Sequence, residues 1–371
     1  MLFKNLLYRS SILLPAFTGQ GQAAPAASQL EKRATLEEYI AAQEKISYAG
    51  VLANIGADGA KGHGASAGLV LASPSKQAPD YFYTWTRDAA LVYKALFEQF
   101  SESGEANLRL LIQDYITAQA KLQTVTNPSG ALWNGAGLGE AKFIADGTQF
   151  TGEWGRPQRD GPPLRAITLS LFGNWLVDNG QSSLAINSIW PTLQNDLAYT
   201  AQYWNETGFD LWEEVPGSSF FATAVQYRAL VQGSAFAKKI GKSCPGCDSQ
   251  APNILCFLQT YWNDGGKYVV SNINTGTRRT GKDIASVLAS VNLFDATVGC
   301  DDVTFQPCSP RALANHKAVT DSFRGIYSLN NGIPQGKGVA VGRYSEDIYY
   351  NGKSLNYSAK ISESEQKLNY F

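Results

Sequence analysis

Three carboxylates and a tryptophan lie together at residues 210–214 of this chain. They form the string Asp210-Leu211-Trp212-Glu213-Glu214. Like charges at this spacing raise each other's pKa unless cations or hydrogen bonds intervene, and a carboxyl group that stays protonated near neutral pH can act as a general acid. Hydrolysis of a sugar acetal needs such an acid, and tryptophan offers an apolar face for a sugar ring. A solvated acidic turn would have the same sequence, so the string alone leaves both interpretations open.

Three other segments each combine an aromatic residue, an arginine and a carboxylate. They are residues 81–88, 154–162 and 341–347. Arginine and aspartate side chains fix hydroxyl groups through paired hydrogen bonds, and aromatic rings stack on sugar faces. A structural Arg–Asp pair would explain any one of these segments. The four segments together, all in connections between predicted helices, predict a carbohydrate-binding pocket.

The elements that would position these segments are mainly helical. Apolar residues recur at helical spacing in nine stretches, and Thr35 with Glu38 forms a capping box at the start of the first. The predicted helices are residues 36–54, 89–100, 108–119, 163–179, 183–204, 219–240, 250–263, 283–293 and 310–328. The best strand signals are residues 68–72 and 268–270. Long connections in a compact domain are usually functional, and here they are residues 55–86, 123–162, 205–218 and 330–352. The pattern predicts an all-α toroid of helix pairs with its site at one end.

The composition excludes several classes of function. The net charge is −1 and charged residues make up only 17 % of the chain, so bulk charge recruits neither nucleic acid nor an anionic membrane surface. The only histidines, His63 and His316, are isolated, and no metal-ligand spacing is present. We therefore expect no metal and no cofactor.

The N-terminal sequence is typical of a secreted protein. Residues 1–24 combine positive charge, a short apolar region and small residues, which predicts a signal peptide. The dibasic pair Lys32-Arg33 predicts a propeptide over residues 25–33, although a disordered N-terminal arm is the alternative. The N-glycosylation sequon at Asn205 fits an extracellular location. No other stretch is long and apolar enough to span a membrane.

The five cysteines are expected to form disulfides in a secreted chain. Cys300 and Cys308 would close a short loop, and Cys244 and Cys247 a tighter one, which leaves Cys256 unpaired. A redox or zinc role for the Cys-x-x-Cys pair is the alternative, but neither a second such pair nor a nearby histidine supports it.

Several longer motifs carry a family resemblance. From Lys32 to about Gly352 the chain resembles the fungal glucoamylases of glycoside hydrolase family 15. The motifs that carry the resemblance are residues 54–59, 83–88, 155–162, 210–215 and 309–317. The resemblance implies an (α/α)6 barrel that removes α-1,4-linked glucose from the non-reducing ends of starch and maltooligosaccharides. It also implies inversion at the anomeric carbon, which gives β-glucose.

The resemblance also implies roles for the acidic cluster. Glu213 would be the general acid on the glycosidic oxygen, and Asp210 and Glu214 would tune it and bind sugar on the leaving-group side. Arg343 would bind glucose hydroxyls beside the cleaved bond, with Asp347 supporting it. From the residues alone, all three carboxylates of the cluster remain candidates for the acid.

The remaining roles concern the terminal glucose. By resemblance, Arg87 and Asp88 would hold its hydroxyls, Tyr81 and Trp85 would line its subsite, and Trp154 would close over the acid. The residues that the resemblance assigns to substrate binding are Tyr81, Trp85, Arg87, Asp88, Trp154, Leu211, Trp212, Arg343 and Asp347.

The chain departs from the family pattern toward its C-terminus. An inverting mechanism needs a second carboxylate as general base. In the family this base lies beyond the point where this chain stops, and residues 364–366 are only superficially similar to its segment, so we expect no general base in this chain. The family has twelve barrel helices against nine predicted here, and the family partner of Cys256 is also missing. We therefore expect an incomplete catalytic domain over residues 34–352 and a divergent tail over 353–371.

One hypothesis explains this departure. The codons for Gly352-Lys353-Ser354 can contain an intron donor sequence, so the tail is interpreted as intron read-through. A truncated paralogue, inactive or serving only to bind carbohydrate, is the alternative. An open toroid exposes apolar faces that a closed one buries, so we expect poor folding and little hydrolysis from this chain, which we predict to be a monomer.

Overall fold

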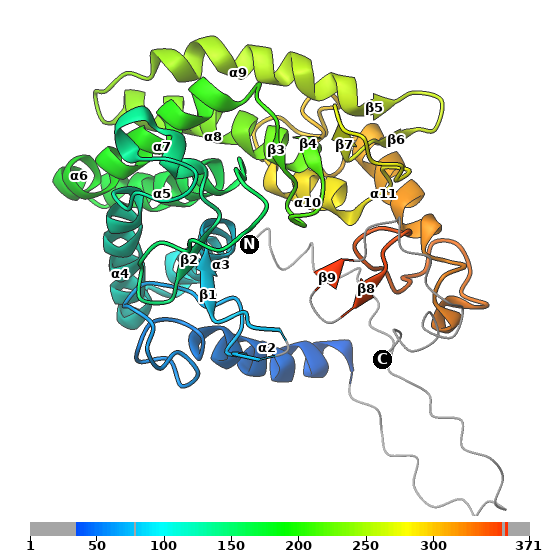
Figure 1. Cartoon of the computed structure of the whole chain (residues 1–371), viewed down its shortest axis with the longest axis horizontal. Coiled ribbons are helices and arrows are strands. Elements are labelled where there is room, and N and C mark those ends of the chain that lie inside the picture. The colour runs from blue at the N-terminus through cyan, green and yellow to red at the C-terminus, as the bar shows by residue number, and fades with distance from the viewer. Residues whose placement is uncertain (1–34, 78, 351–352, 355–371) are drawn as a thin grey trace, which may run out of the picture.

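The computed structural model describes residues 35–77, 79–350 and 353–354. The predicted signal peptide and propeptide lie outside this part of the chain, as does most of the predicted tail. Figure 1 shows the helices following one another around a ring. The described residues include nine α-helices of nine residues or more: α2 (Leu36–Leu52), α3 (Thr86–Ser103), α4 (Ala106–Gln123), α5 (Gly161–Asp178), α7 (Trp190–Tyr203), α8 (Phe220–Lys239), α9 (Pro245–Leu258), α10 (Ile284–Asn292) and α11 (Pro310–Ser322).

Alternate helices form two layers of this ring. Helix α3 packs against α5, α5 against α8, and α8 against α10, whereas α4, α7, α9 and α11 each pack against the neighbouring member of that series. Helix α5 is buried at most of its positions, which explains why its apolar residues do not keep to one face. The main hydrophobic core lies between the two layers. This is the helix-pair arrangement that the sequence predicts.

Local sequence signals set several helix ends. The capping box of Thr35 and Glu38 is formed at the start of α2, as predicted. Gly180, with φ of 73°, follows the last turn of α5 in the left-handed conformation that glycine adopts readily. Helix α9 begins at Pro245, five residues before the predicted start, because a proline is accommodated in the first turn. Helix α11 ends at Ser322, six residues before the predicted end.

Short strands and turns connect the helices. The strands are β1 (Tyr83–Trp85), β2 (Lys142–Ile144), β3 (Gly208–Phe209), β4 (Pro216–Ser219), β5 (Trp262–Asn263), β6 (Tyr268–Val269), β7 (Asn272–Ile273), β8 (Tyr349–Tyr350) and β9 (Lys353–Ser354). The shorter helical turns are α6 (Ser182–Leu184), a π-helical turn (Ala185–Ile189) and 3-10 turns at Leu132–Asn134, Ala136–Gly139, Gln259–Tyr261 and Ser328–Asn330. The strand predicted at residues 268–270 is confirmed by β6. The one predicted at residues 68–72 is wrong, because only an isolated bridge between Ile55 and Val70 forms there.

Three sets of backbone pairings involve the segments that the sequence singled out. Strand β1 pairs antiparallel with β2, with Trp85 opposite Lys142. Strands β3, β4 and β7 form a three-stranded sheet that holds the two ends of the acidic segment. An isolated bridge joins Asp283 to Tyr344, which places residues 341–347 next to the start of α10. Residues far apart in the chain thus meet at the connections between helices.

A buried ion pair ties the two helix layers together. Arg165 of α5 donates two hydrogen bonds to the carboxylate of Asp196 in α7, at 2.8 and 2.6 Å. Both side chains are almost fully buried, at 2 % and 0 % exposure. Gln123 of α4 donates to Asp196, and Gln119 of α4 accepts from Arg165. Burying such a pair costs free energy, because both charges lose their water. Removing one partner is strongly destabilising, because the other charge is then buried without a counter-charge.

Both predicted disulfides are present. One joins Cys244 to Cys247 at the start of α9, and the other joins Cys300 to Cys308 before α11. Cys256 is free and exposed. In the described ranges no helix is long and apolar enough to cross a membrane, and no group of three or more histidine, cysteine, aspartate or glutamate residues could hold a metal ion.

Candidate functional site

The acidic segment is a tight turn organised by Asp210. Its buried carboxylate accepts hydrogen bonds from the backbone N–H groups of Glu214 and Val215, at 2.9 and 3.1 Å. The backbone N–H of Glu213 donates to the carbonyl oxygen of Asp210. This geometry places Glu213 at φ of 66°, a conformation that costs a non-glycine residue free energy and that is concentrated at functional sites. Asp210 therefore shapes the turn that presents Glu213.

Burial, more than charge repulsion, raises the pKa of Asp210. Desolvation is its largest cause, and repulsion from Glu214 is the smallest of those that act on it. Repulsion from Glu214 does raise the pKa of Asp210, as the sequence predicts, but it contributes less than burial. Backbone hydrogen bonds and the positive charge of Arg279 oppose the shift.

The side chain of Glu213 is anchored through one oxygen. Its Oε1 accepts from the indole Nε1–H of Trp85 at 2.5 Å and from Nε2–H of Gln158 at 2.8 Å. The guanidinium of Arg87 lies 3.6 Å from the same oxygen. Among the described residues, Oε2 has no hydrogen-bond partner. The side chain is 17 % exposed, so this second oxygen is available to a ligand.

Arg87 organises the residues around this carboxylate. It is the second residue of α3, and its Nη1 donates to Gln158 at 2.8 Å and to the buried Asp160 at 3.0 Å. Its Nε lies 3.6 Å from Asp88, whose side chain is 39 % exposed. The nearby carboxylates raise the pKa of Arg87, so it stays charged. Asp88 is therefore held by Arg87 and remains open to a ligand.

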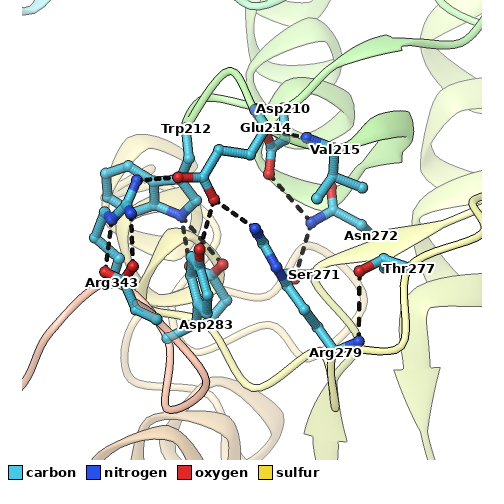
Figure 2. Close-up of polar contacts among 12 residues, drawn as sticks. Asp210, Trp212, Glu214, Val215, Ser271, Asn272, Thr277, Arg279, Asp283 and Arg343 are labelled. Atoms are coloured by element: carbon cyan, nitrogen blue, oxygen red, sulfur yellow. Dashed lines mark hydrogen bonds and ion pairs between the residues drawn. The ribbon is translucent and has the colours of Figure 1, made fainter. Parts of the chain in front are cut away.

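Glu214 points into a separate cluster of cations, which Figure 2 shows. Its Oε1 accepts from Arg343 at 2.6 Å, and its Oε2 accepts from Arg279 at 2.5 Å and from the hydroxyl of Tyr344 at 2.6 Å. Arg343 also makes a two-bond ion pair with Asp347, at 2.8 and 2.7 Å. Glu214 is thus paired with two permanent cations.

Trp212 connects this cluster to α10. Its Nε1–H donates to both oxygens of Asp283, at 3.0 and 3.1 Å, and Asp283 is the N-cap of α10. The guanidinium of Arg343 lies 5.5 Å from the centre of the Trp212 ring, within the range of a cation–π interaction. The side chains of Leu211 and Trp212 are both partly buried against the hydrophobic core.

Aromatic rings form a wall beside Glu213. The ring of Trp85 lies 6.0 Å from that of Tyr81 and 5.9 Å from that of Trp154, edge to face in both pairs. The ammonium group of Lys142, on β2, lies 3.5 Å from the centre of the Trp154 ring and 5.0 Å from that of Trp85. Two further rings lie close to the same ammonium group, at 4.0 Å for Tyr83 and 4.1 Å for Phe150.

The environment of Lys142 leads to a testable pH dependence. The residue is only 2 % exposed, and burial lowers the pKa of its ammonium group to about 8. Below that pH the charge attracts the surrounding rings, and above it the amine is neutral in the folded state. We expect tryptophan fluorescence to titrate with a midpoint near pH 8, and Lys142→Met to abolish that transition. A matched Lys94→Met variant on α3 should keep it, and equal titration of wild type and Lys142→Met would contradict the prediction.

The structure brings all four sequence-predicted segments into one region. Residues 81–88, 154–162 and 210–214 meet at Glu213, and residues 341–347 meet the acidic segment at Glu214. The sequon residue Asn205 is exposed in the connection after α7.

Sequence reasoning missed four contributors. Gln158 and Tyr344 lie inside segments that the sequence singled out, so their positions could have marked them as candidates for the site. Lys142 and Arg279 lie elsewhere, with no pattern that marks them. Their roles follow only from contacts across long stretches of chain.

Comparisons with known proteins agree with this arrangement. Residues 45–361 match the model of glycosyl hydrolases family 15. A glucoamylase of Neurospora crassa is 57 % identical over 91 % of this chain and 53 % of its own length, and glucoamylase-1 of Schizophyllum commune is 54 % identical over 85 % and 54 %. The solved structure of the family 15 glucoamylase from Hypocrea jecorina superposes with a TM-score of 0.84 at 55 % identity, covering 85 % of this chain and 53 % of that one.

A more distant structure gives the same fold. The glucoamylase from Saccharomycopsis fibuligera superposes with a TM-score of 0.79 at 30 % identity, over 90 % of this chain and 73 % of that one. The chain spans about half the length of the curated relatives just described. The chain belongs to glycosyl hydrolases family 15, and its helices form part of the (α/α)6 toroid of that family.

Proposed function

We propose that the site hydrolyses terminal α-1,4-linked glucose at the non-reducing ends of starch and maltooligosaccharides. The anomeric carbon is inverted and β-D-glucose is released. The similar proteins are called glucoamylases, but this chain spans about half of their length, so its activity and substrates are proposals. The observation that carries the proposal is the asymmetric environment of the Glu213 carboxyl group.

The contacts of the three carboxylates favour Glu213 as the general acid. Asp210 is buried and bonded to the backbone of its own turn. Glu214 is paired with Arg343 and Arg279, so both of its oxygens are occupied by cations. Glu213 has its Oε1 occupied by donors, so a proton on this group resides on Oε2, the oxygen available to a ligand. An acid in this position can protonate a glycosidic oxygen.

The surroundings of Glu213 suit a neutral, hydroxyl-rich ligand. Asp88, supported by Arg87, offers acceptors for sugar hydroxyls, and Trp85 and Trp154 offer aromatic surface. Arg343, fixed by its pair with Asp347, offers donors near Glu214. Ion pairs hold Asp88 against Arg87 and Arg343 against Asp347, so these groups are oriented before a ligand binds.

Inversion also needs a carboxylate that activates water on the opposite face of the sugar, about 6.5–9.5 Å from the acid. The sequence predicts that this base is not in the chain, and that remains a prediction. Binding of maltooligosaccharides without release of glucose would favour the alternative of a carbohydrate-binding protein.

The proposal is tested by following the hydrolysis of maltotriose by this chain with proton NMR. We expect slow release of glucose, because no general base is predicted in the chain, with β-glucose as the first sugar product before spontaneous mutarotation produces the α anomer. A parallel sample of pure β-glucose measures that background rate. Initial release of α-glucose would overturn inversion, and cleavage at internal bonds of longer maltooligosaccharides would overturn action at the chain end.

We also propose that the protein is secreted, glycosylated at Asn205 and monomeric, with residues 34–352 as the catalytic domain. The sequence motifs at the N-terminus and the exposed position of Asn205 support this proposal.

A further inference from the structure

A second surface with sugar-binding chemistry lies beside the aromatic wall. It is a groove of about 490 Å³ between the segment that precedes β1 and the segment that follows β2. We call it the β1–β2 groove. Its lining includes Lys76, Asp80, Phe82, Tyr83, Phe150 and Thr151.

Three half-buried rings give the β1–β2 groove its apolar surface. Tyr83 and Phe150 pack edge to face with centroids 5.3 Å apart. The ammonium of Lys76 lies 4.1 Å from the centre of the Phe82 ring. Rings that are partly exposed and fixed by such contacts lose little freedom when a ligand stacks on them.

The polar groups of the groove are also fixed. The Asp80 carboxylate accepts from the backbone N–H of Phe82 and from the hydroxyl of Tyr83, both at 3.1 Å. Each carboxylate oxygen keeps acceptor capacity for a further donor. Thr151 is exposed and adds a hydroxyl group. The positive charge of Lys76 offsets the negative charge of Asp80. This combination suits a ligand that is neutral, rich in hydroxyl groups and apolar on one face.

The rings of the groove contact the aromatic wall of the candidate active site. Tyr83 packs edge to face against Trp85, with centroids 6.2 Å apart, and Phe150 packs in the same way against Trp154 at 6.0 Å. The Lys142 ammonium lies within 5.0 Å of all four ring centres. One buried cation therefore supports the rings of both surfaces. A polymer bound at the site would pass close to a second surface of matching chemistry.

We propose that the β1–β2 groove binds a segment of an α-1,4-glucan chain, separately from the chain end held at Glu213. The identity of the ligand rests on the proposed function, whereas the existence of a sugar site rests on the groove itself. Binding here would hold a long substrate near the site between successive cleavages.

The test uses β-cyclodextrin, a cyclic α-1,4-glucan with no chain end to offer to the active site. Calorimetric titration of the whole chain is expected to show saturable binding. Phe82→Ala and Thr151→Arg should each weaken that binding about ten-fold, the change that corresponds to roughly 1.4 kcal/mol. Phe82 also packs against a small core cluster, so the exposed Thr151 supplies a variant that leaves the interior intact.

Two controls locate the binding. Glu213→Gln should bind β-cyclodextrin like the wild type, because the active site is not used. Trp133→Ala should also bind normally, since Trp133 is an exposed aromatic outside the groove, at 86 % exposure. No binding, or loss of binding in Trp133→Ala with retention in Thr151→Arg, would overturn the proposal. Binding that maps to the groove without hydrolysis of maltotriose would support the groove and reject the proposed function.

Discussion

Glu213→Gln is expected to slow the release of glucose from maltotriose by about 10²- to 10⁴-fold, the usual contribution of a general acid. Glutamine keeps the size of the side chain and an oxygen that can accept from Trp85 and Gln158, but it carries no acidic proton. The measurement compares kcat for maltotriose with kcat for α-glucosyl fluoride. Fluoride leaves without being protonated, so the loss with this substrate should be much smaller.

The control for this variant is Glu44→Gln, the same change at an exposed position of α2, which should leave both rates unaltered. Equal losses of kcat with the two substrates would show that Glu213 positions the sugar and does not donate the proton. A Glu213→Gln variant as active as the wild type on maltotriose would remove the acid assignment altogether.

Asp196→Ala is expected to lower the free energy of unfolding by about 3–5 kcal/mol, because it leaves the Arg165 guanidinium charged and without its carboxylate in the core. The loss should appear as a lower midpoint in urea denaturation followed by circular dichroism. The side-chain hydrogen-bond partners of Asp196 are Arg165 and Gln123, which make no contact with Glu213 or Glu214, so the variant separates the stability of the helix layers from the chemistry of the site.

Two further variants show whether the buried charge is responsible. Asp178→Ala removes an ion pair with Lys239 whose carboxylate is 63 % exposed, and it should cost at most about 1 kcal/mol. Replacing both buried partners, as Arg165→Met with Asp196→Leu, should recover much of the stability lost by Asp196→Ala. A double variant as unstable as the single one would attribute the loss to packing instead of charge.

The sequence by itself determined several helix ends and which connections meet at the candidate site. Thr35 and Glu38 form their capping box, and Gly180 follows the end of α5, because these signals act over three or four residues. The two short-range disulfides were predictable for the same reason. The family followed from long motifs, and it predicted the toroid.

Only the tertiary structure distinguished the three neighbouring carboxylates. Asp210, Glu213 and Glu214 are nearly adjacent in the chain, yet one is bonded to its own turn, one to Trp85 and Gln158, and one to two arginines. The partners of Glu213 and Glu214 come from segments that lie tens of residues away on either side. Sequence spacing does not reveal such contacts, because the packing of helices and short strands decides which distant segments meet.

The same reason explains why Lys142 and Arg279 escaped prediction. A lysine in a short strand and an arginine in a loop are ordinary residues until the fold surrounds one with aromatic rings and places the other against Glu214. Burial lowers the pKa of Lys142, and burial is a property of the folded chain. The sequence determined which residues were available to the site, and the tertiary structure decided which of them act together.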